Sequence, residues 1–206
     1  MSGKVKIVGL GGSLDGSSSS LAALKVALEA SAISGAEVQL LDIHALALPM
    51  FEPRLSKEKN VCDFCEAVYE ADGMLWCSPL YHGTISGAFK NALDWLELLG
   101  KRQPAYLTDK VIGLISTAGG TQGLQAINTM EYIVRALRGW TVPLVVPVPR
   151  AWQNFDKEGH PLDETIERQL QALGDEVVRA AGIFAAQRMT TVAAQAAEAA
   201  LNPSEG

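Results

Sequence analysis

The chain has 206 residues, of which 48% are hydrophobic and 19% charged, and its formal net charge is -6. This length and composition predict a single domain with a buried core and argue against a disordered chain. The acidic balance, without a Lys/Arg cluster, argues against nucleic acid as a partner. Neither a signal-peptide pattern nor an apolar run of about 18 residues is found, so we expect a cytoplasmic protein without a membrane span. Three cysteines suit reduced thiols better than a disulfide framework.

Short apolar runs alternate with longer helical patterns, which is typical of a parallel sheet with helices on both faces. Strands are expected at residues 5–10, 38–42, 73–78, 111–116 and 142–146, and helices at 20–33, 60–71, 87–99, 124–137 and from 163 past 184. Residues 43–60 carry two prolines and are expected to form a long surface loop. Pro143 lacks an amide donor and places the fifth strand at a sheet edge.

These elements predict an α/β fold, a three-layer sandwich with a five-stranded parallel sheet. One domain is expected over residues 1–186, followed by an Ala-rich tail over 187–206 that is either a helical extension or a frayed end. In an open parallel sheet, ligands bind beyond the carboxyl ends of the strands. Three loops leave the first, third and fourth strands in that direction, and all three are rich in small polar residues.

The first loop, residues 11–20, reads GGSLDGSSSS and leads directly into a helix. Glycine amides, serine hydroxyls and a helix N-terminus suit a phosphate, although a turn with a serine cap is the plainer alternative. Residues 9–11 also begin a dinucleotide fingerprint, with Asp42 placed as its ribose-binding acid. Leu14 stands where the third glycine of that fingerprint belongs, so a mononucleotide is favoured.

The second loop, residues 79–86, combines a proline, an aromatic ring and a glycine, which suits the face and polar edge of a flat ring system. The third loop, residues 117–123, offers backbone donors before another helix. Each of the two is also compatible with an ordinary turn. Together with the first loop they predict one ligand site.

The segments GSLDGSSSS at 12–20, SPLYHGTISGAFKNALDW at 78–95 and STAGGTQG at 116–123 resemble the NADPH-dependent FMN reductase family of flavodoxin-like proteins. The likeness covers most of residues 4–180, and parts of it also resemble arsenic-resistance flavoproteins. It implies a flavodoxin-like fold, FMN as cofactor, and NADPH or NADH as co-substrate. It also implies a homodimer or homotetramer. Lys90, Asn91 and Asp94 would be structural or subunit-contact positions, because such proteins commonly pair through this region.

The resemblance assigns site residues by position. Ser13, Ser18 and Ser20 would hold the FMN phosphate, with Ser19 nearby. The isoalloxazine and ribityl chain would contact Pro79, Leu80, Tyr81, His82 and Gly83, and the other side of the ring would be bordered by Thr117, Ala118, Gly119 and Gly120. Asp15 stands where many relatives have an arginine that helps to neutralise the phosphate. An acid there either repels the anion or points outward and favours the helix N-terminus.

Other candidate residues receive plainer interpretations. His82 is a possible proton donor, but more often such a loop histidine is a ligand wall or solvated. Cys62 and Cys65 form a possible redox pair, although one helix face with buried thiols is favoured. Trp95, Trp140 and Trp152 are possible subunit contacts, with core packing favoured for Trp140. No metal site and no catalytic side chain are expected.

The sequence thus predicts an FMN-dependent oxidoreductase that takes hydride from NAD(P)H and passes electrons to a small acceptor: free flavin, a quinone, an azo compound or a metal ion. A non-enzymatic flavin carrier or sensor is the alternative. The phosphate loop does not match the Thr-x-Thr-Gly-x-Thr pattern of true flavodoxins, which favours the reductase. A Rossmann-type dehydrogenase that uses NAD is a third possibility.

Overall fold

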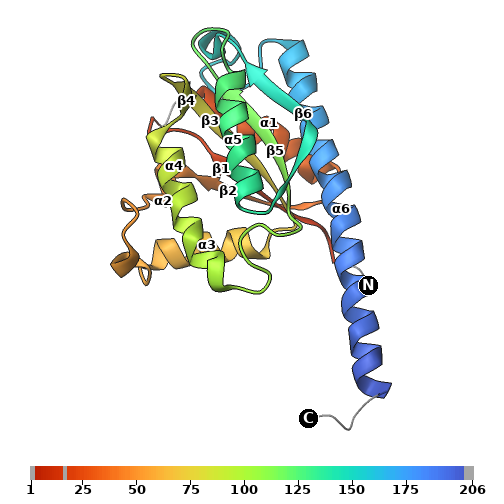
Figure 1. Cartoon of the computed structure of the whole chain (residues 1–206). Helices are drawn as coiled ribbons and strands as arrows, with labels where there is room; N and C mark the ends of the chain where they lie inside the picture. The colour runs from red at the N-terminus through yellow and green to blue at the C-terminus, as the bar shows by residue number, and fades with distance from the viewer. Residues whose placement is uncertain (1–2, 16–17, 202–206) are drawn as a thin grey trace.

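The computed structural model describes residues 3–15 and 18–201 and is built around one twisted sheet (Figure 1). Five parallel strands lie in the order β2-β1-β3-β5-β6, and the short β4 pairs with β3 in the antiparallel sense. The strands are β1 (Lys6–Gly11), β2 (Glu37–Asp42), β3 (Gly73–Tyr81), β4 (Thr84–Ile85), β5 (Val111–Thr117) and β6 (Trp140–Val148). The α/β prediction is confirmed, and β6 lies at the edge that Pro143 indicated.

Helices cover both faces of the sheet. They are α1 (Ser19–Ile33), α2 (Ile43–Leu46), α3 (Lys59–Glu70), α4 (Gly87–Asp94), α5 (Leu124–Ala136) and α6 (Glu164–Leu201), with 3-10 turns at Pro53–Leu55, Trp95–Lys101 and Ala151–Gln153. Figure 1 shows α3, α4 and α5 on one face, with α1 and α6 on the other. Helix α6 continues well beyond the sheet, so residues 187–201 are a helical extension; residues 202–206 of the expected tail lie outside the described residues.

Strand alternation divides the core into two halves. In β3, Met74 and Trp76 point to the face of α3 and α4, whereas Leu75 and Cys77 pack with α1 and α6. Trp76 meets Phe89 edge to face at a ring-centroid distance of 5.8 Å. Both faces of β3 and β5 are therefore buried, as their nearly continuous apolar sequences indicate.

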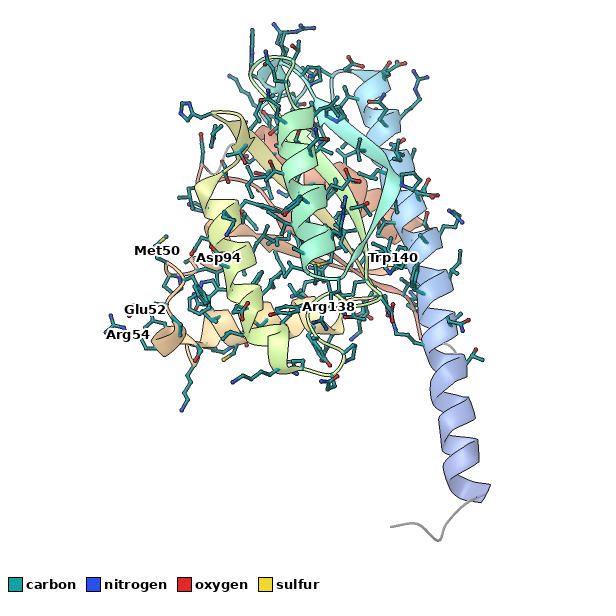
Figure 2. All side chains as sticks on the ribbon, in the orientation of Figure 1. Met50, Glu52, Arg54, Asp94, Arg138 and Trp140 are labelled. Atoms are coloured by element: carbon teal, nitrogen blue, oxygen red, sulfur yellow. The ribbon has the colours of Figure 1, made fainter. Side chains whose placement is uncertain are left out.

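Several sequence-based boundaries were wrong. Residues 43–60 are not one loop, because Asp42 caps the short helix α2 and a 3-10 turn follows; Met50, Glu52 and Arg54 point outward from this segment (Figure 2). Asn60 does not cap α3, which begins at Lys59; its amide instead donates to the carbonyls of residues 46 and 47. The helix expected over 87–99 changes to 3-10 geometry at Trp95.

Two of the tryptophan expectations also fail. Trp95 is fully buried, and its indole donates to the Pro49 carbonyl at 3.0 Å, so it does not form a subunit contact. Trp140, expected in the core, is 56% exposed because it begins the edge strand; Figure 2 shows it beside the lower part of β6. The expectation of two buried thiols is wrong for Cys62, which is exposed; Cys65 is buried, and burial raises the pKa of its thiol to about 11. Over the described part of the chain, no helix is long and apolar enough to cross a bilayer.

Candidate functional site

The three predicted loops meet at the carboxyl edge of the sheet. Gly11 at the end of β1 lies opposite Cys77 of β3, and Pro79 lies opposite Thr117 at the end of β5. The strand order reverses between β1 and β3, since β2 flanks β1 on one side and β3 on the other. Such a reversal opens a crevice beyond the strand ends, and this crevice is where doubly wound sheets bind their ligands.

The loop between β1 and α1 begins with a sharp turn. Gly12 has a φ of +97°, a conformation that side-chain-bearing residues rarely adopt. The Ser13 hydroxyl accepts a hydrogen bond from the Asp15 amide at 3.1 Å, which keeps this buried serine inside the loop. Ser18 then caps α1 by accepting from the Ser20 amide at 3.2 Å. No acidic residue occupies the first turn of α1, so the positive end of the helix dipole is not neutralised there.

A hydroxyl contact joins the first loop to the third. Ser20 in the first turn of α1 and Thr117 at the end of β5 share a hydrogen bond, although 97 residues separate them. Both side chains are almost fully buried, with 2% and 4% exposure. The contact brings together two of the predicted site segments and places hydroxyls beneath the start of α1.

The second loop is a hairpin, where the sequence predicted only a loop. Strand β3 continues to Tyr81, so Pro79, Leu80 and Tyr81 belong to a strand, and only His82 and Gly83 form the turn. Both turn residues have positive φ, +49° and +87°, as a type I′ hairpin turn requires. Tyr81 is 53% exposed, and the two turn residues are exposed as well. The glycine at 83 was the available signal for this turn.

A buried serine anchors the hairpin at its base. The Ser78 hydroxyl accepts from the Ser86 amide at 3.0 Å, and Ser86 in turn caps α4 by accepting from the Phe89 amide at 3.1 Å. This fixes the backbone before and after the exposed turn, because two of its flanking residues are tied together. The Tyr81 ring and the amides of the turn are therefore presented on a rigid base.

The third loop is anchored in the same way. Ser116, the register partner of Ser78, donates its hydroxyl to the Gly123 carbonyl at 2.7 Å. The Ala118 amide donates to the Val148 carbonyl at 3.0 Å, and the Gly120 carbonyl accepts from the Arg150 amide at 3.0 Å. Ala118 is buried, whereas Gly119 and Gly120 are exposed at the edge.

The segment between β6 and α6 forms one side of a cavity that the sequence did not predict. A cavity of about 440 Å³ lies between α1 and this segment, and it is lined by Ser18 and Ser19 as well as by Trp152. Trp152 is 69% exposed. The turn over residues 155–159 was the signal available in the sequence. The cavity flanks the start of α1 and does not extend to the hairpin residues.

This donor set suits a phosphate monoester attached to a flat ring. Serine hydroxyls and a helix N-terminus without an acid in its first turn attract an anion, while an exposed tyrosine and glycine amides border the adjoining edge. Asp15 is exposed, and its negative charge weighs against tight phosphate binding. Among residues 3–15 and 18–201, no group of three or more His, Cys, Asp or Glu side chains is placed to hold a metal ion.

The chain is similar to known proteins in sequence and in fold. The family model of NADPH-dependent FMN reductases matches residues 5–153. An NADPH-dependent FMN reductase ArsH of Acidithiobacillus ferrooxidans is 34% identical over 126 residues, 61% of this chain and 52% of that protein. An NADPH:quinone oxidoreductase of Arabidopsis thaliana is 28% identical over 186 residues, 81% of this chain and 87% of that protein.

Among solved structures, the flavoenzyme FerB of Paracoccus denitrificans matches with a TM-score of 0.70 at 19% identity, over 87% of this chain and 98% of that one. A flavodoxin from the domain Archaea matches with a TM-score of 0.59 at 10% identity, over 87% and 99%. The chain spans between half and three fifths of the length of the first two curated relatives. The fold is flavodoxin-like, and the chain belongs to the NADPH-dependent FMN reductase family.

Proposed function

We propose that this protein is an NAD(P)H-dependent FMN reductase that passes electrons from its flavin to a small-molecule acceptor. The observation that carries the proposal is the Ser20–Thr117 contact, which joins the start of α1 to the end of β5 at the carboxyl edge. Membership of the family adds support, since the matched segment includes all three loops. When bound, FMN would supply the chemistry by accepting a hydride and releasing electrons one or two at a time.

The protein's own residues would bind and orient the cofactor. The hydroxyls of Ser13, Ser18, Ser19 and Ser20 would hold the phosphate at the N-terminus of α1. The strand end and turn over residues 79–83 would contact the ring and ribityl chain, and residues 117–120 would border the ring from the other side. The anchored backbones of the hairpin and the third loop support this role, because fixed amide donors stabilise negative charge at low reorganisation cost.

The acceptor belongs to the class of small oxidants. Curated relatives carry the names quinone oxidoreductase and azoreductase, the latter in Staphylococcus haemolyticus, and those substrates are redox-active organic molecules. An exposed tyrosine beside the ring site suits a flat acceptor that stacks on the flavin. We extend these acceptor classes to this protein, together with free flavin and metal ions.

We further propose that the protein is a cytoplasmic homodimer or homotetramer with a flavin-binding domain over residues 1–186. Tyr132 of α5 is one exposed aromatic side chain available for contact between subunits. The analytical check on assembly is the mass in solution, measured by light scattering at several concentrations.

The experiment that tests the function is visible spectroscopy of the purified protein with added FMN, followed by NADPH under anaerobic conditions. Flavin bands that remain with the protein after gel filtration and bleach rapidly on NADPH addition are expected. Tight FMN binding with no bleaching by NADPH or NADH would instead indicate an electron carrier or sensor. A protein that excludes FMN and binds NAD would indicate a dehydrogenase.

A further inference from the structure

The cavity beside the phosphate loop has the composition of a nucleotide subsite. Its floor forms where Gly159 approaches α1, since a Cβ at that position would lie 3.5 Å from Ala22. Ser18, Ala22 and Lys25 follow one face of α1, at spacings of about one turn each. The cavity of about 440 Å³ therefore begins at the phosphate-binding end of the helix and continues along it.

An aromatic wall faces this stripe of α1. Trp152 lines the cavity and leaves 69% of its surface exposed, which is unusual for the largest apolar side chain. Backbone hydrogen bonds from the Arg150 amide to the Gly120 carbonyl and from the Ala151 amide to the Ala118 carbonyl hold its segment beside the third loop. An exposed indole on a fixed backbone is a stacking platform for a planar base.

Two lysines supply positive charge at the same cavity. Lys25 and Lys157 both line it and are exposed. Within the described ranges, 3–15 and 18–201, neither lysine takes part in an ion pair. Both ammonium groups therefore remain available to an anion such as a phosphate.

Two carboxylates line the cavity, and they differ in whether hydrogen bonds within the turn already engage them. Asp156 is committed to its own turn: its Oδ1 accepts from the amides of Glu158 and His160 at 2.9 and 2.8 Å, and its Oδ2 lies 3.0 Å from His160 Nδ1. The His160 amide is the main cause of the lowered pKa of Asp156. Glu158 is exposed and lines the cavity, where a carboxylate can accept from ribose hydroxyls or from an adenine amino group.

We propose that this cavity binds an adenosine 5′-phosphate group, with the base on Trp152, the ribose or amino group at Glu158, and the phosphate between Lys25 and Lys157. Two molecules carry that group to a flavin reductase: the nicotinamide nucleotide co-substrate, and FAD in place of FMN. The choice between these two sources rests on the proposed function. The assignment of an adenosine 5′-phosphate group rests on the cavity alone.

The first test titrates AMP, as the probe, into the full-length protein and follows tryptophan fluorescence. Saturable binding is expected, and Trp152→Ala should weaken it about tenfold, the usual scale of losing one base–aromatic stack. Trp140→Ala is the matched control, because Trp140 is also exposed but lies at the start of β6 and does not line this cavity. Absence of AMP binding, or equal affinity in the wild type and in Trp152→Ala, would overturn the proposal.

A second pair of variants separates the phosphate from the base. Lys25→Ala combined with Lys157→Ala should weaken AMP about tenfold and leave adenosine binding unchanged, since adenosine lacks the phosphate. Lys57→Ala, another exposed lysine without an ion pair among the described residues, is the control. Equal losses for AMP and adenosine would contradict the placement of the phosphate.

The source of the group follows from the same variants. A Trp152→Ala protein whose KM for NADPH rises about tenfold, with FMN affinity unchanged, assigns the cavity to the co-substrate. A Trp152→Ala protein that loses affinity for FAD but keeps its KM for NADPH assigns the cavity to the adenosine of FAD. FMN binding without AMP binding would end this inference and leave the proposed function standing, whereas AMP binding without FMN binding would do the reverse.

Discussion

The two ends of the parallel strands differ in residue composition; we call them the carboxyl edge and the amino edge. At the carboxyl edge, hydroxyls, glycines and helix starts surround exposed loops, and buried serines at positions 78 and 116 anchor those loops from below. At the amino edge, charged side chains close the fold: Asp72 accepts from the Lys6 amide at 2.9 Å and pairs with Arg188 of α6. The carboxyl edge is thus exposed and polar, whereas paired charges cover the amino edge.

The amino edge also contains a buried lysine. Lys110 is only 7% exposed and donates from Nζ to the carbonyls of Tyr69 and Ala71 at 2.6 and 2.5 Å, which caps the C-terminal end of α3. Arg188 extends the closure by donating to the Asp109 carbonyl at 3.0 Å. Hydrogen bonds and ion pairs of charged side chains thus join α3, β1 and α6 at the amino edge. At the carboxyl edge, the buried side chains that anchor the loops are the uncharged serines at positions 78 and 116.

The largest expected effect comes from breaking the amino-edge closure. Asp72→Ala removes the acceptor of the Lys6 amide and the partner of Arg188, both partly buried, and should lower the free energy of unfolding by about 2–3 kcal/mol. Urea denaturation measures the change, and FMN affinity should stay the same. Glu70→Ala, which removes an exposed ion pair with Lys6, is the control and should cost under about 1 kcal/mol. A loss of FMN affinity in Asp72→Ala would contradict the separation of the two edges.

Lys110 makes the amino edge sensitive to alkaline pH. Burial lowers its pKa to about 8, Arg188 adds to the shift and Asp72 opposes it. Since the unfolded lysine keeps its proton up to about pH 10.4, the unfolded state binds more protons between about pH 8 and 10.4, and stability rises with pH in that window. The wild type should gain about 1–2 kcal/mol over Lys110→Met between about pH 8 and 9.5. Unfolding curves for both proteins at each pH would show a constant difference if the interpretation is wrong.

At the carboxyl edge we expect a binding effect of about tenfold. Ser20→Ala removes the hydroxyl that bonds Thr117 and would hold the FMN phosphate, which corresponds to roughly 1.4 kcal/mol of affinity. Ser31→Ala is the matched control on the same helix, because the Ser31 hydroxyl is buried and donates to the carbonyls of Ala27 and Gly174. Fluorescence titration with FMN should separate the two variants; equal affinities would remove Ser20 from the site.

The smallest expected effect concerns Asp15. Replacing this exposed acid with asparagine removes a negative charge from the loop that would bind the phosphate, so FMN affinity should rise about two- to fivefold. The gain should shrink as salt concentration increases, because exposed charges are screened. Titrations at low and high salt measure it, and an unchanged affinity at low salt would show that the carboxylate points away from the phosphate.

The sequence predicted the parts of the fold that follow from periodicity. Buried strands such as β3 and β5 read as continuous apolar runs, and the edge position of β6 followed from Pro143. The β3–β4 hairpin was missed, because two residues of β4 give no periodic signal. Trp140 was misplaced although its strand was expected at an edge, because the hydrophobicity of a single residue does not show whether its side chain is buried.

For the candidate site, the sequence indicated that three loops share one edge of the sheet, but it did not indicate the contacts between them. Three Gly/Ser-rich segments after apolar strands indicated the carboxyl edge, and parallel topology brings such ends together. The hydroxyl contact between Ser20 and Thr117 depends on tertiary register across 97 residues, which local pattern does not encode. The cavity at Trp152 was missed for the same reason, since the segment after β6 crosses to α1 only in the folded chain.

The most direct test of the central claim is amide hydrogen exchange of the full-length protein with and without FMN. We expect slower exchange in the three carboxyl-edge loops, residues 12–20, 79–86 and 117–123, and unchanged exchange at the amino edge around residues 69–72 and 105–110. Protection at the amino edge, or none in any of the three loops under conditions that saturate FMN binding, would contradict the claim.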